Sequence, residues 1–235
     1  MVRLCLIEQV GYREWTESLG SDREWIIQVA QADFYGRIQR EASRLGAFAL
    51  PLRHDYIAVL TTSLGREEHE QIFDTARIST MLPVRAACVS HNIPRKALDD
   101  AHRVLANTSP GELSYMEGHD GLTVVAHFDV NGITRKTRGE GLASSLEVIN
   151  GTFHRLGLEA LRLGGIPQYL GGDNVLVVLP DEGYEDIVER LLGLGELKVG
   201  VGVSVKPRRS LMLATRALTR VRHEPGAGRL QVEVG

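Results

Sequence analysis

The sequence predicts an α+β protein of two tandem ferredoxin-like βαββαβ domains, in which helices cover antiparallel sheets. Three observations predict this fold. The chain of 235 residues is long enough for two small domains. Its two halves align with each other without large gaps. Each half also shows the same order of patterns, namely strand, helix, hairpin, helix, strand and helix.

The internal repeat rests on three pairs of segments that occur in the same order along the chain. The paired segments are residues 4–12 with 124–133, 45–60 with 163–178, and 84–98 with 197–211. The alignment places Glu8 opposite Asp129 and Asp55 opposite Asp173. Chance is a poor explanation for this order, so we expect two copies of one domain.

The repeat also sets the expected domain boundaries. We expect the first domain to cover residues 1–106 and the second to cover residues 122–235. The segment between them, NTSPGELSYMEGHDG (107–121), is polar and contains glycine and proline. That composition is typical of a linker.

The first long helix of each domain is predicted from its apolar spacing. SDRE (21–24) is typical of a capping box, in which Ser21 and Glu24 satisfy free backbone amides at the helix start. Gly46 and Gly164 are natural stops at the two C-termini. We expect both apolar stripes in the core: Ile26, Val29, Ala30, Phe34, Ile38 and Leu45 in the first domain, and Leu142, Leu146, Ile149, Phe153 and Leu156 in the second.

Composition and charge narrow the class of protein. A formal net charge of -3 argues against general attraction to nucleic acid or to anionic membranes, so an anionic ligand must be held locally. No run approaches the roughly 18 apolar residues of a membrane span, and the N-terminus lacks a signal-peptide pattern, which predicts a cytoplasmic protein. Cys5 and Cys88 each lie in an aliphatic strand-like run, so we expect two small buried hydrophobes rather than a disulfide or a metal site.

The stretch QYLGGDNVLVVLP (168–180) predicts a hairpin. Two short apolar runs flank Gly171 and Gly172, which supply the backbone freedom that a tight tip needs. Asp173 follows at the mouth of this apolar sheet. The alternative is that Asp173 is a turn carboxylate that caps its own backbone.

The predicted topology brings two carboxylates together. In a βαββαβ unit the first strand pairs with the hairpin, so Asp129 at the end of that strand lies near Asp173 at the hairpin tip. Two adjacent carboxylates repel unless a cation lies between them, and Mg²⁺ suits such a site because its shell is completed by waters and phosphate oxygens. The alternative to a metal site is that the two aspartates take part in structural ion pairs.

Residues that follow Asp129 are of the type that binds a triphosphate. Asn131, Gly132, Ile133 and Thr134 form a glycine-containing turn that leads into a helix, whose first backbone amides favour phosphate. The basic run of Lys206, Arg208 and Arg209 is expected to reach the same edge of the sheet, with a solvated loop as the alternative. His127 points to the same face as Asp129 by strand alternation, with a satisfied core histidine as the alternative.

These motifs resemble the palm-type superfamily of nucleotidyl cyclases and polymerases, and most closely the GTP cyclohydrolase III (GTP cyclohydrolase IIa) family. Diguanylate cyclases continue the Gly-Gly-Asp signature with Glu-Phe, whereas Asn174 and Val175 stand here. The resemblance covers nearly the whole chain. The matching motifs are Tyr12 with Trp15-Thr16, HFDVNGIT (127–134), LGGDN (170–174) and VGVGV (199–203).

The resemblance implies an activity and a ligand set. The expected reaction is Mg²⁺-dependent hydrolysis of GTP, which opens the guanine imidazole ring, retains the formyl group and removes two phosphates. The product is a formamidopyrimidine ribosylamino 5′-monophosphate, an early intermediate for riboflavin or deazaflavin cofactors. The expected ligands of two Mg²⁺ ions are Asp129, Asp173 and the carbonyl of Val130. Activation by a monovalent cation and a homo-oligomer are further expectations.

Roles for other residues of the second domain follow from the same resemblance. His127 is expected to take part in ring opening together with the two aspartates, and Asn131 and Asn174 are expected to contact guanine or ribose. The triphosphate is expected to contact the turn 131–134, Gly171, Gly172, Lys206 and Arg209. The alternatives are a palm-type nucleotidyl cyclase and a GTP-binding sensor without turnover.

The first domain departs from this pattern. Its hairpin carries Arg53-His54-Asp55-Tyr56 in place of two glycines, so bulky side chains crowd the tip. We therefore expect one metal site, in the second domain, with the first domain completing the base pocket.

Overall fold

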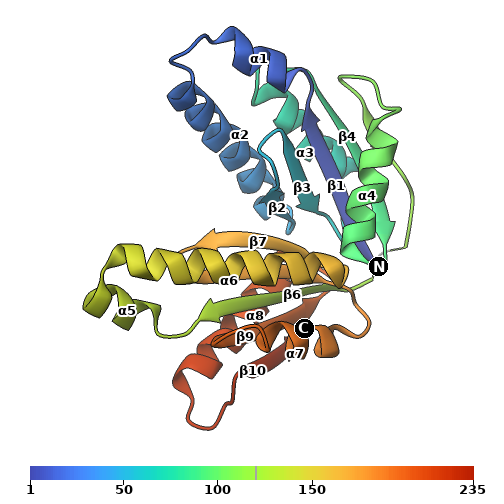
Figure 1. The fold of residues 1–235 in the computed structure, drawn as a ribbon. Coiled ribbons are helices and arrows are strands. Elements are labelled where there is room, and N and C mark those ends of the chain that lie inside the picture. Colours follow the sequence, from blue (N-terminus) through green and yellow to red (C-terminus); the bar gives the residue numbers. More distant parts are fainter. Residues whose placement is uncertain (120) are drawn as a thin grey trace.

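The computed structural model describes residues 1–119 and 121–235, which form two α+β units one after the other along the chain (Figure 1). The elements of the first unit are β1 (Val2–Gln9), α1 (Tyr12–Ser18), α2 (Glu24–Arg44), β2 (Phe48–Pro51), β3 (Tyr56–Leu60), α3 (Arg66–Ile78), β4 (Val84–His91), α4 (Pro94–Leu105) and β5 (Leu113–Tyr115). Those of the second are β6 (Thr123–Val130), α5 (Ile133–Glu140), α6 (Leu142–Arg162), β7 (Ile166–Gly171), β8 (Asn174–Leu179), α7 (Tyr184–Leu192), β9 (Leu197–Ser204), α8 (Pro207–His223) and β10 (Leu230–Val234).

The predicted fold class is confirmed. The first sheet has the order β2-β3-β1-β4-β5, and the second has the order β10-β9-β6-β8-β7. In each sheet the four strands of the βαββαβ unit are antiparallel, as predicted. The sheets are nevertheless mixed, because β5 joins β4 in parallel and β10 joins β9 in parallel.

Part of the predicted linker belongs to the first sheet. Residues 113–115 form β5 and pair with β4, so the polar segment 107–121 is not a free connection over its whole length. Residue 120 of that segment lies outside the described residues. The domain boundaries at residues 106 and 122 stay a prediction.

The starts of the long helices differ from the prediction. The capping box is wrong, because α2 begins at Glu24 after Arg23 and no side chain caps its first amides. The apolar stripes are partly wrong: Val29, Leu142 and Leu146 are exposed, whereas Ile27 is buried. In the second unit the first turns of α6 extend past the end of β7 (Figure 1), and Leu142 and Leu146 of these turns are exposed.

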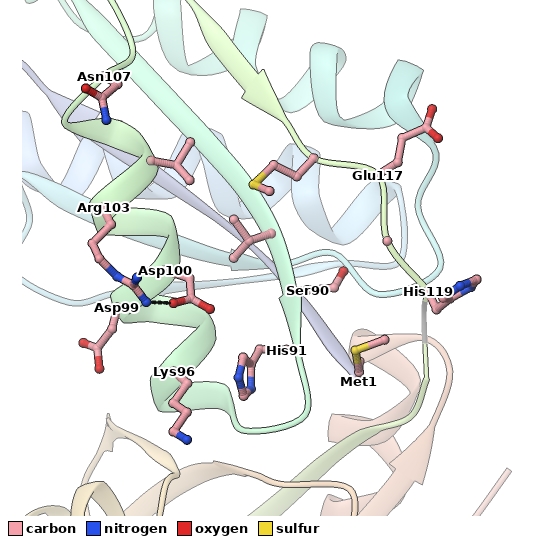
Figure 2. Close-up of a pocket in the computed structure, with 14 residues that line it drawn as sticks. Met1, Ser90, His91, Lys96, Asp99, Asp100, Arg103, Asn107, Glu117 and His119 are labelled. Atoms are coloured by element: carbon pink, nitrogen blue, oxygen red, sulfur yellow. Dashed lines mark hydrogen bonds and ion pairs between the residues drawn. The ribbon is translucent and has the colours of Figure 1, made fainter.

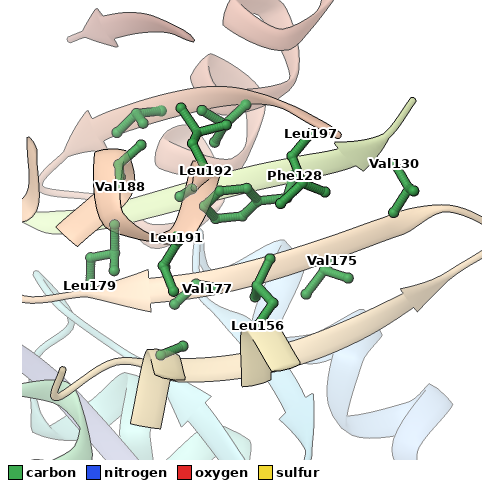
Figure 3. Close-up of a cluster of buried hydrophobic side chains, with 14 of the residues drawn as sticks. Phe128, Val130, Leu156, Val175, Val177, Leu179, Val188, Leu191, Leu192 and Leu197 are labelled. Carbon is green, nitrogen blue, oxygen red and sulfur yellow. The ribbon is translucent and has the colours of Figure 1, made fainter. Parts of the chain in front are cut away.

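Figure 3 shows the core of the second unit, which lies between its sheet and helices α6 and α7. Phe128 of β6 is fully buried there, together with Leu156 of α6 and Leu191 of α7. Alternate residues of β6 point to the opposite face, where α8 packs. A second apolar cluster joins that face to the corresponding face of the first sheet, with Leu4 and Leu176 among its members. The two units therefore share a core.

The contact between the units repeats the internal symmetry of the sequence. The backbone N–H of Arg95, at the start of α4, donates to the carbonyl of Gly164 at 3.0 Å. In the symmetric position, the N–H of Arg208 at the start of α8 donates to the carbonyl of Gly46, also at 3.0 Å. The side chain of Arg95 also donates to the carbonyl of Leu161 near the end of α6, and the side chain of Arg208 donates to that of Ser43 near the end of α2. Arg208 therefore joins the two units, and the expectation that it reaches the sheet edge that carries Asp129 is wrong.

The expectation for the two cysteines is also wrong. Cys5 of β1 and Cys88 of β4 form a disulfide, and they are directly opposite each other in the antiparallel register. Both are buried, as expected for small hydrophobes. The pairing was not apparent from the sequence because it depends on the register of two strands that lie far apart along the chain.

No helix of the described part of the chain is long and apolar enough to cross a membrane.

Candidate active site

The candidate site lies where β6 ends beside the tip of the β7–β8 hairpin. Asp129 of β6 is the register partner of Asn174 of β8, and the N–H of Val130 donates to the carbonyl of Asp173 at 3.0 Å. Asp129 and Asp173 consequently line one cavity of about 740 Å³. The structure thus brings together the two carboxylates that the topology of the sequence predicts to be neighbours.

The hairpin tip depends on its two glycines. Gly171 has a φ of 102° and Gly172 a φ of 59°, values in the left-handed region that side chains with a Cβ rarely adopt. The hydroxyl of Tyr169 donates to the carbonyl of Gly172 at 2.9 Å, which braces the turn. The glycines therefore set the position of Asp173, although they do not line the cavity themselves.

The turn after β6 supplies backbone donors to the same cavity. Gly132 adopts a left-handed conformation with a φ of 76° and is the N-cap of α5, where no side chain of the described residues satisfies the first amides. Asn131, Gly132, Ile133 and Thr134 all line the cavity, as predicted from the sequence. A helix N-terminus with free N–H groups favours an anion, so this side of the cavity suits phosphate.

Two basic residues predicted for the site lie elsewhere. Lys206 and Arg209 follow the end of β9, whose last residue, Ser204, pairs with Thr123 at the start of β6. Since β6 runs from Thr123 towards Asp129, these cations are about 20 Å from the carboxylates along the strand. The prediction that Lys206 and Arg209 reach the site is therefore wrong. Because β9 runs antiparallel to β6, the start of β9 lies next to the site and its end does not.

Three other basic residues line the cavity instead. Lys198 is the register partner of Asp129 on β9, and Arg135 lies in the first turn of α5. Arg222, in the last turn of α8, forms an ion pair with Asp129 and contacts the side-chain oxygen of Asn174 at 3.3 Å. Lys198 could have been placed at the site from the sequence, because the repeat alignment predicts that β9 lies beside β6. No sequence signal distinguishes Arg222 from the other arginines of α8.

His127 lies beside Asn174, and it does not line the cavity. The side-chain NH₂ of Asn174 donates to Asp173 at 2.8 Å, which leaves its oxygen to accept from Nε2 of His127 at 3.0 Å. This arrangement assigns the proton of the neutral ring to Nε2. Burial lowers the pKa of His127, and the positive charge of Arg222 lowers it further. His127 therefore contacts Asn174 rather than the cavity, and its part in ring opening stays a prediction.

The lowered pKa of His127 predicts a pH-dependent stability. A histidine whose folded-state pKa lies below the unfolded value of about 6.5 binds its proton preferentially in the unfolded chain. Its contribution is complete above pH 6.5 and is lost as the pH falls towards the folded-state pKa. We expect the free energy of unfolding, measured with denaturant at pH 8 and 5.5, to fall more in the wild type than in His127→Gln. An equal fall in both proteins would contradict this assignment.

Sequence comparisons establish the family to which this fold and cavity belong. A family model described as GTP cyclohydrolase III matches residues 3–234. The chain belongs to the GTP cyclohydrolase III family. The resemblance inferred from the motifs is therefore confirmed, and the protein is an enzyme.

Three relatives span nearly the full length of the chain. The GTP cyclohydrolase III of Aeropyrum pernix is 39% identical and aligns over 99% of this chain and 97% of its own. That of Pyrobaculum aerophilum is 34% identical, over 100% and 99%. That of Saccharolobus solfataricus is 31% identical, over 94% and 95%.

The solved structures that the chain resembles are more distant. A GGDEF domain from Pseudomonas aeruginosa is 18% identical, with a TM-score of 0.43 over 60% of this chain and 90% of that chain. A bacterial light-regulated adenylyl cyclase is 13% identical, with a TM-score of 0.42 over 99% of this chain and 85% of its own. At this level of similarity they say nothing about activity.

In this family member the cavity of the second unit has a donor set that fits Mg²⁺. It offers two carboxylates and exposed backbone groups, and it has no histidine or cysteine in its lining. Among the described residues, no group of three or more His, Cys, Asp or Glu side chains could hold a metal ion. A metal bound here must therefore complete its shell with water or phosphate oxygens, which is the behaviour of Mg²⁺.

The corresponding position of the first unit is closed by its own side chains. Glu8 receives a hydrogen bond from Tyr56 at 2.7 Å and an ion pair from Arg85 at 2.6 Å. Asp55 is paired with Arg53 at 2.6 Å. Burial, followed by the hydrogen bond to Glu8, raises the pKa of Tyr56 to about 12. Both carboxylates are thus neutralised by residues of this unit. In the second unit Asp129 is likewise paired with Arg222, whereas Asp173 accepts a hydrogen bond from the amide of Asn174 and has no ion pair within the described part of the chain.

A larger cavity of about 1000 Å³ lies in the first unit, between α4 and the segment that follows β5 (Figure 2). Its lining includes Lys96, Asp99 and Arg103 of α4, and Arg103 is paired with Asp100 in the same helix. None of the residues predicted for the site lines this cavity. Its described lining also lacks a glycine turn that leads into a helix, which is the feature that suits the candidate site to phosphate.

Proposed function

We propose that this protein hydrolyses GTP and opens the imidazole ring of guanine. One water adds at C8 and the C8–N9 bond breaks, so that C8 stays as a formyl group on the former N7. Two further waters remove the γ- and β-phosphates as inorganic phosphate. The product is the formamidopyrimidine ribosylamino 5′-monophosphate, which is suited to riboflavin or deazaflavin biosynthesis. The observation that supports this proposal most strongly is the family match over residues 3–234.

We further propose that Asp129, Asp173 and the carbonyl of Val130 hold two Mg²⁺ ions. Mg²⁺ held there would neutralise the triphosphate and would lower the pKa of a water in its shell. Both aspartates line the cavity of the second unit, and so does Val130, which follows Asp129 and whose N–H donates to the carbonyl of Asp173. Two carboxylates, with the remaining positions left to waters and phosphates, form a suitable protein contribution to such a site.

The chain's own residues hold the substrate around this centre. The free amides at the start of α5 bind phosphate oxygens, and the cations of Lys198 and Arg135 face the same cavity. Asn131 and Asn174 present amide groups for the guanine or the ribose. His127 fixes which way the amide of Asn174 points, because its Nε2 proton occupies the amide oxygen. An amide with a fixed orientation can distinguish one base from another, because it offers its donor and its acceptor in set positions.

The experiment that tests the function is an incubation of the purified protein with GTP and Mg²⁺. Mass spectrometry follows the nucleotide, and a phosphate assay runs in parallel. We expect a formamidopyrimidine monophosphate and two inorganic phosphates for each GTP consumed. A cyclic nucleotide with pyrophosphate would assign the protein to the cyclases instead, and unchanged GTP with measurable binding would indicate a sensor. Either result would contradict the proposal.

A further inference from the structure

Arg222 occupies the position next to Asp129 that a metal ion needs. Its guanidinium forms an ion pair with a carboxylate oxygen of Asp129 and contacts the oxygen of Asn174 at 3.3 Å. The side chain of Asp129 is only 12% exposed, so few directions of approach to its oxygens remain. A guanidinium and a divalent cation compete for the same lone pairs of a carboxylate.

The arginine is placed so that it can leave this position. It lies in the last turn of α8, and its side chain is 34% exposed, which is far more than that of Asp129. The guanidinium also borders the cavity, where the amides at the start of α5 favour an anion. When a triphosphate is bound, its charged oxygens lie close to the guanidinium of Arg222. The arginine can then exchange Asp129 for a phosphate oxygen and keeps an anionic partner throughout.

The charge balance of the site favours this exchange. With Arg222 in place, the positive charge next to Asp129 opposes binding of a free divalent cation. A metal ion that arrives together with a triphosphate brings more negative charge than positive, so the same arginine attracts the complex. The site therefore discriminates between free metal and metal bound to nucleotide.

We propose that Arg222 is a positioning residue that holds Asp129 in the metal-free enzyme and transfers to the triphosphate when the metal–nucleotide complex binds. This inference rests on the proposed function, because it takes the ligand to be a nucleoside triphosphate with Mg²⁺. Its consequence is that free Mg²⁺ binds weakly and that metal and nucleotide bind together. Arg222 thereby sets the order of binding at the site.

The first measurement uses no nucleotide and no turnover. Mn²⁺ is titrated into the metal-free protein, and free Mn²⁺ is followed by electron paramagnetic resonance. We expect Arg222→Gln to bind Mn²⁺ at least about tenfold more tightly than the wild type, because the competing charge is removed. Arg222→Lys keeps the charge and is expected to stay near the wild type. Arg220→Gln is the matched control, since Arg220 lies on the same helix but pairs with Glu224 and Glu233.

The second measurement adds the β,γ-imido analogue of GTP with Mn²⁺ in excess. We expect Arg222→Gln to bind the analogue about tenfold more weakly, because a contact to phosphate is lost. Unchanged or weaker Mn²⁺ binding in the first titration would overturn the proposal, and so would unchanged analogue binding in the second. If the wild type fails to convert GTP, the proposed function fails, whereas the Mn²⁺ titration still reports on Arg222.

Discussion

Asp173→Asn is expected to abolish GTP turnover and to leave the fold intact. Asparagine has the same shape as aspartate but lacks the charge that a bound Mg²⁺ requires. We expect the turnover rate to fall at least about a thousandfold, which corresponds to ~4 kcal/mol of transition-state stabilisation. The fold should persist because Asp173 is half-buried at a hairpin tip whose shape depends on the two preceding glycines. Initial rates and a thermal unfolding curve test both parts.

The repeat provides a matched control for this variant. Asp55 is the aligned residue of the first unit, and it is paired with Arg53 at 2.6 Å. We expect Asp55→Asn to keep turnover close to the wild-type rate, since that carboxylate is neutralised within its own unit. An equal loss in both variants would place the chemistry between the units or in the first one, and wild-type turnover in Asp173→Asn would refute the metal assignment.

Gly202→Ala is expected to have the largest effect on stability. A Cβ at Gly202 would lie 1.9 Å from the carbonyl oxygen of Ser210 and 2.4 Å from the backbone nitrogen of Ala214. Both atoms belong to the backbone of α8, so the whole helix must move away from β9. Overpacking of this kind costs about 1–3 kcal/mol and at times more, and we expect a loss of about 3 kcal/mol in the free energy of unfolding. The displaced helix also carries Arg222 away from Asp129.

Gly139→Ala is the control for this substitution. Gly139 lies in α5, has no positive φ, and a Cβ there would meet nothing within 4 Å. Alanine is favoured over glycine in a helix by about 1 kcal/mol, so this variant should be as stable as the wild type or more stable. Denaturant unfolding of both variants measures the difference. Equal stability of Gly202→Ala and the wild type would show that α8 does not pack on β9 as described.

Strand topology explains which parts of the site were predictable. Asp129 and Asp173 follow from the repeat, because a βαββαβ unit always places the end of its first strand beside the hairpin tip. The turn 131–134 follows directly from Asp129 along the chain. These residues needed only the order of the strands, which the sequence pattern reveals.

The remaining parts depend on packing between distant segments. Arg222 reaches Asp129 only because α8 crosses the sheet on glycines of β9, and no local pattern reveals where a helix ends over a sheet. Lys206 and Arg209 were misplaced because their position depends on the direction of β9. The Cys5–Cys88 disulfide depends on the register between two strands separated by 83 residues.

We propose that the second unit, and not the first, binds the metal and the triphosphate. The most direct test is a crystal structure with Mn²⁺ and the β,γ-imido analogue of GTP, with diffraction data recorded at the manganese edge. We expect anomalous peaks between Asp129 and Asp173, with the phosphates at the start of α5. Peaks between Glu8 and Asp55 of the first unit would contradict it.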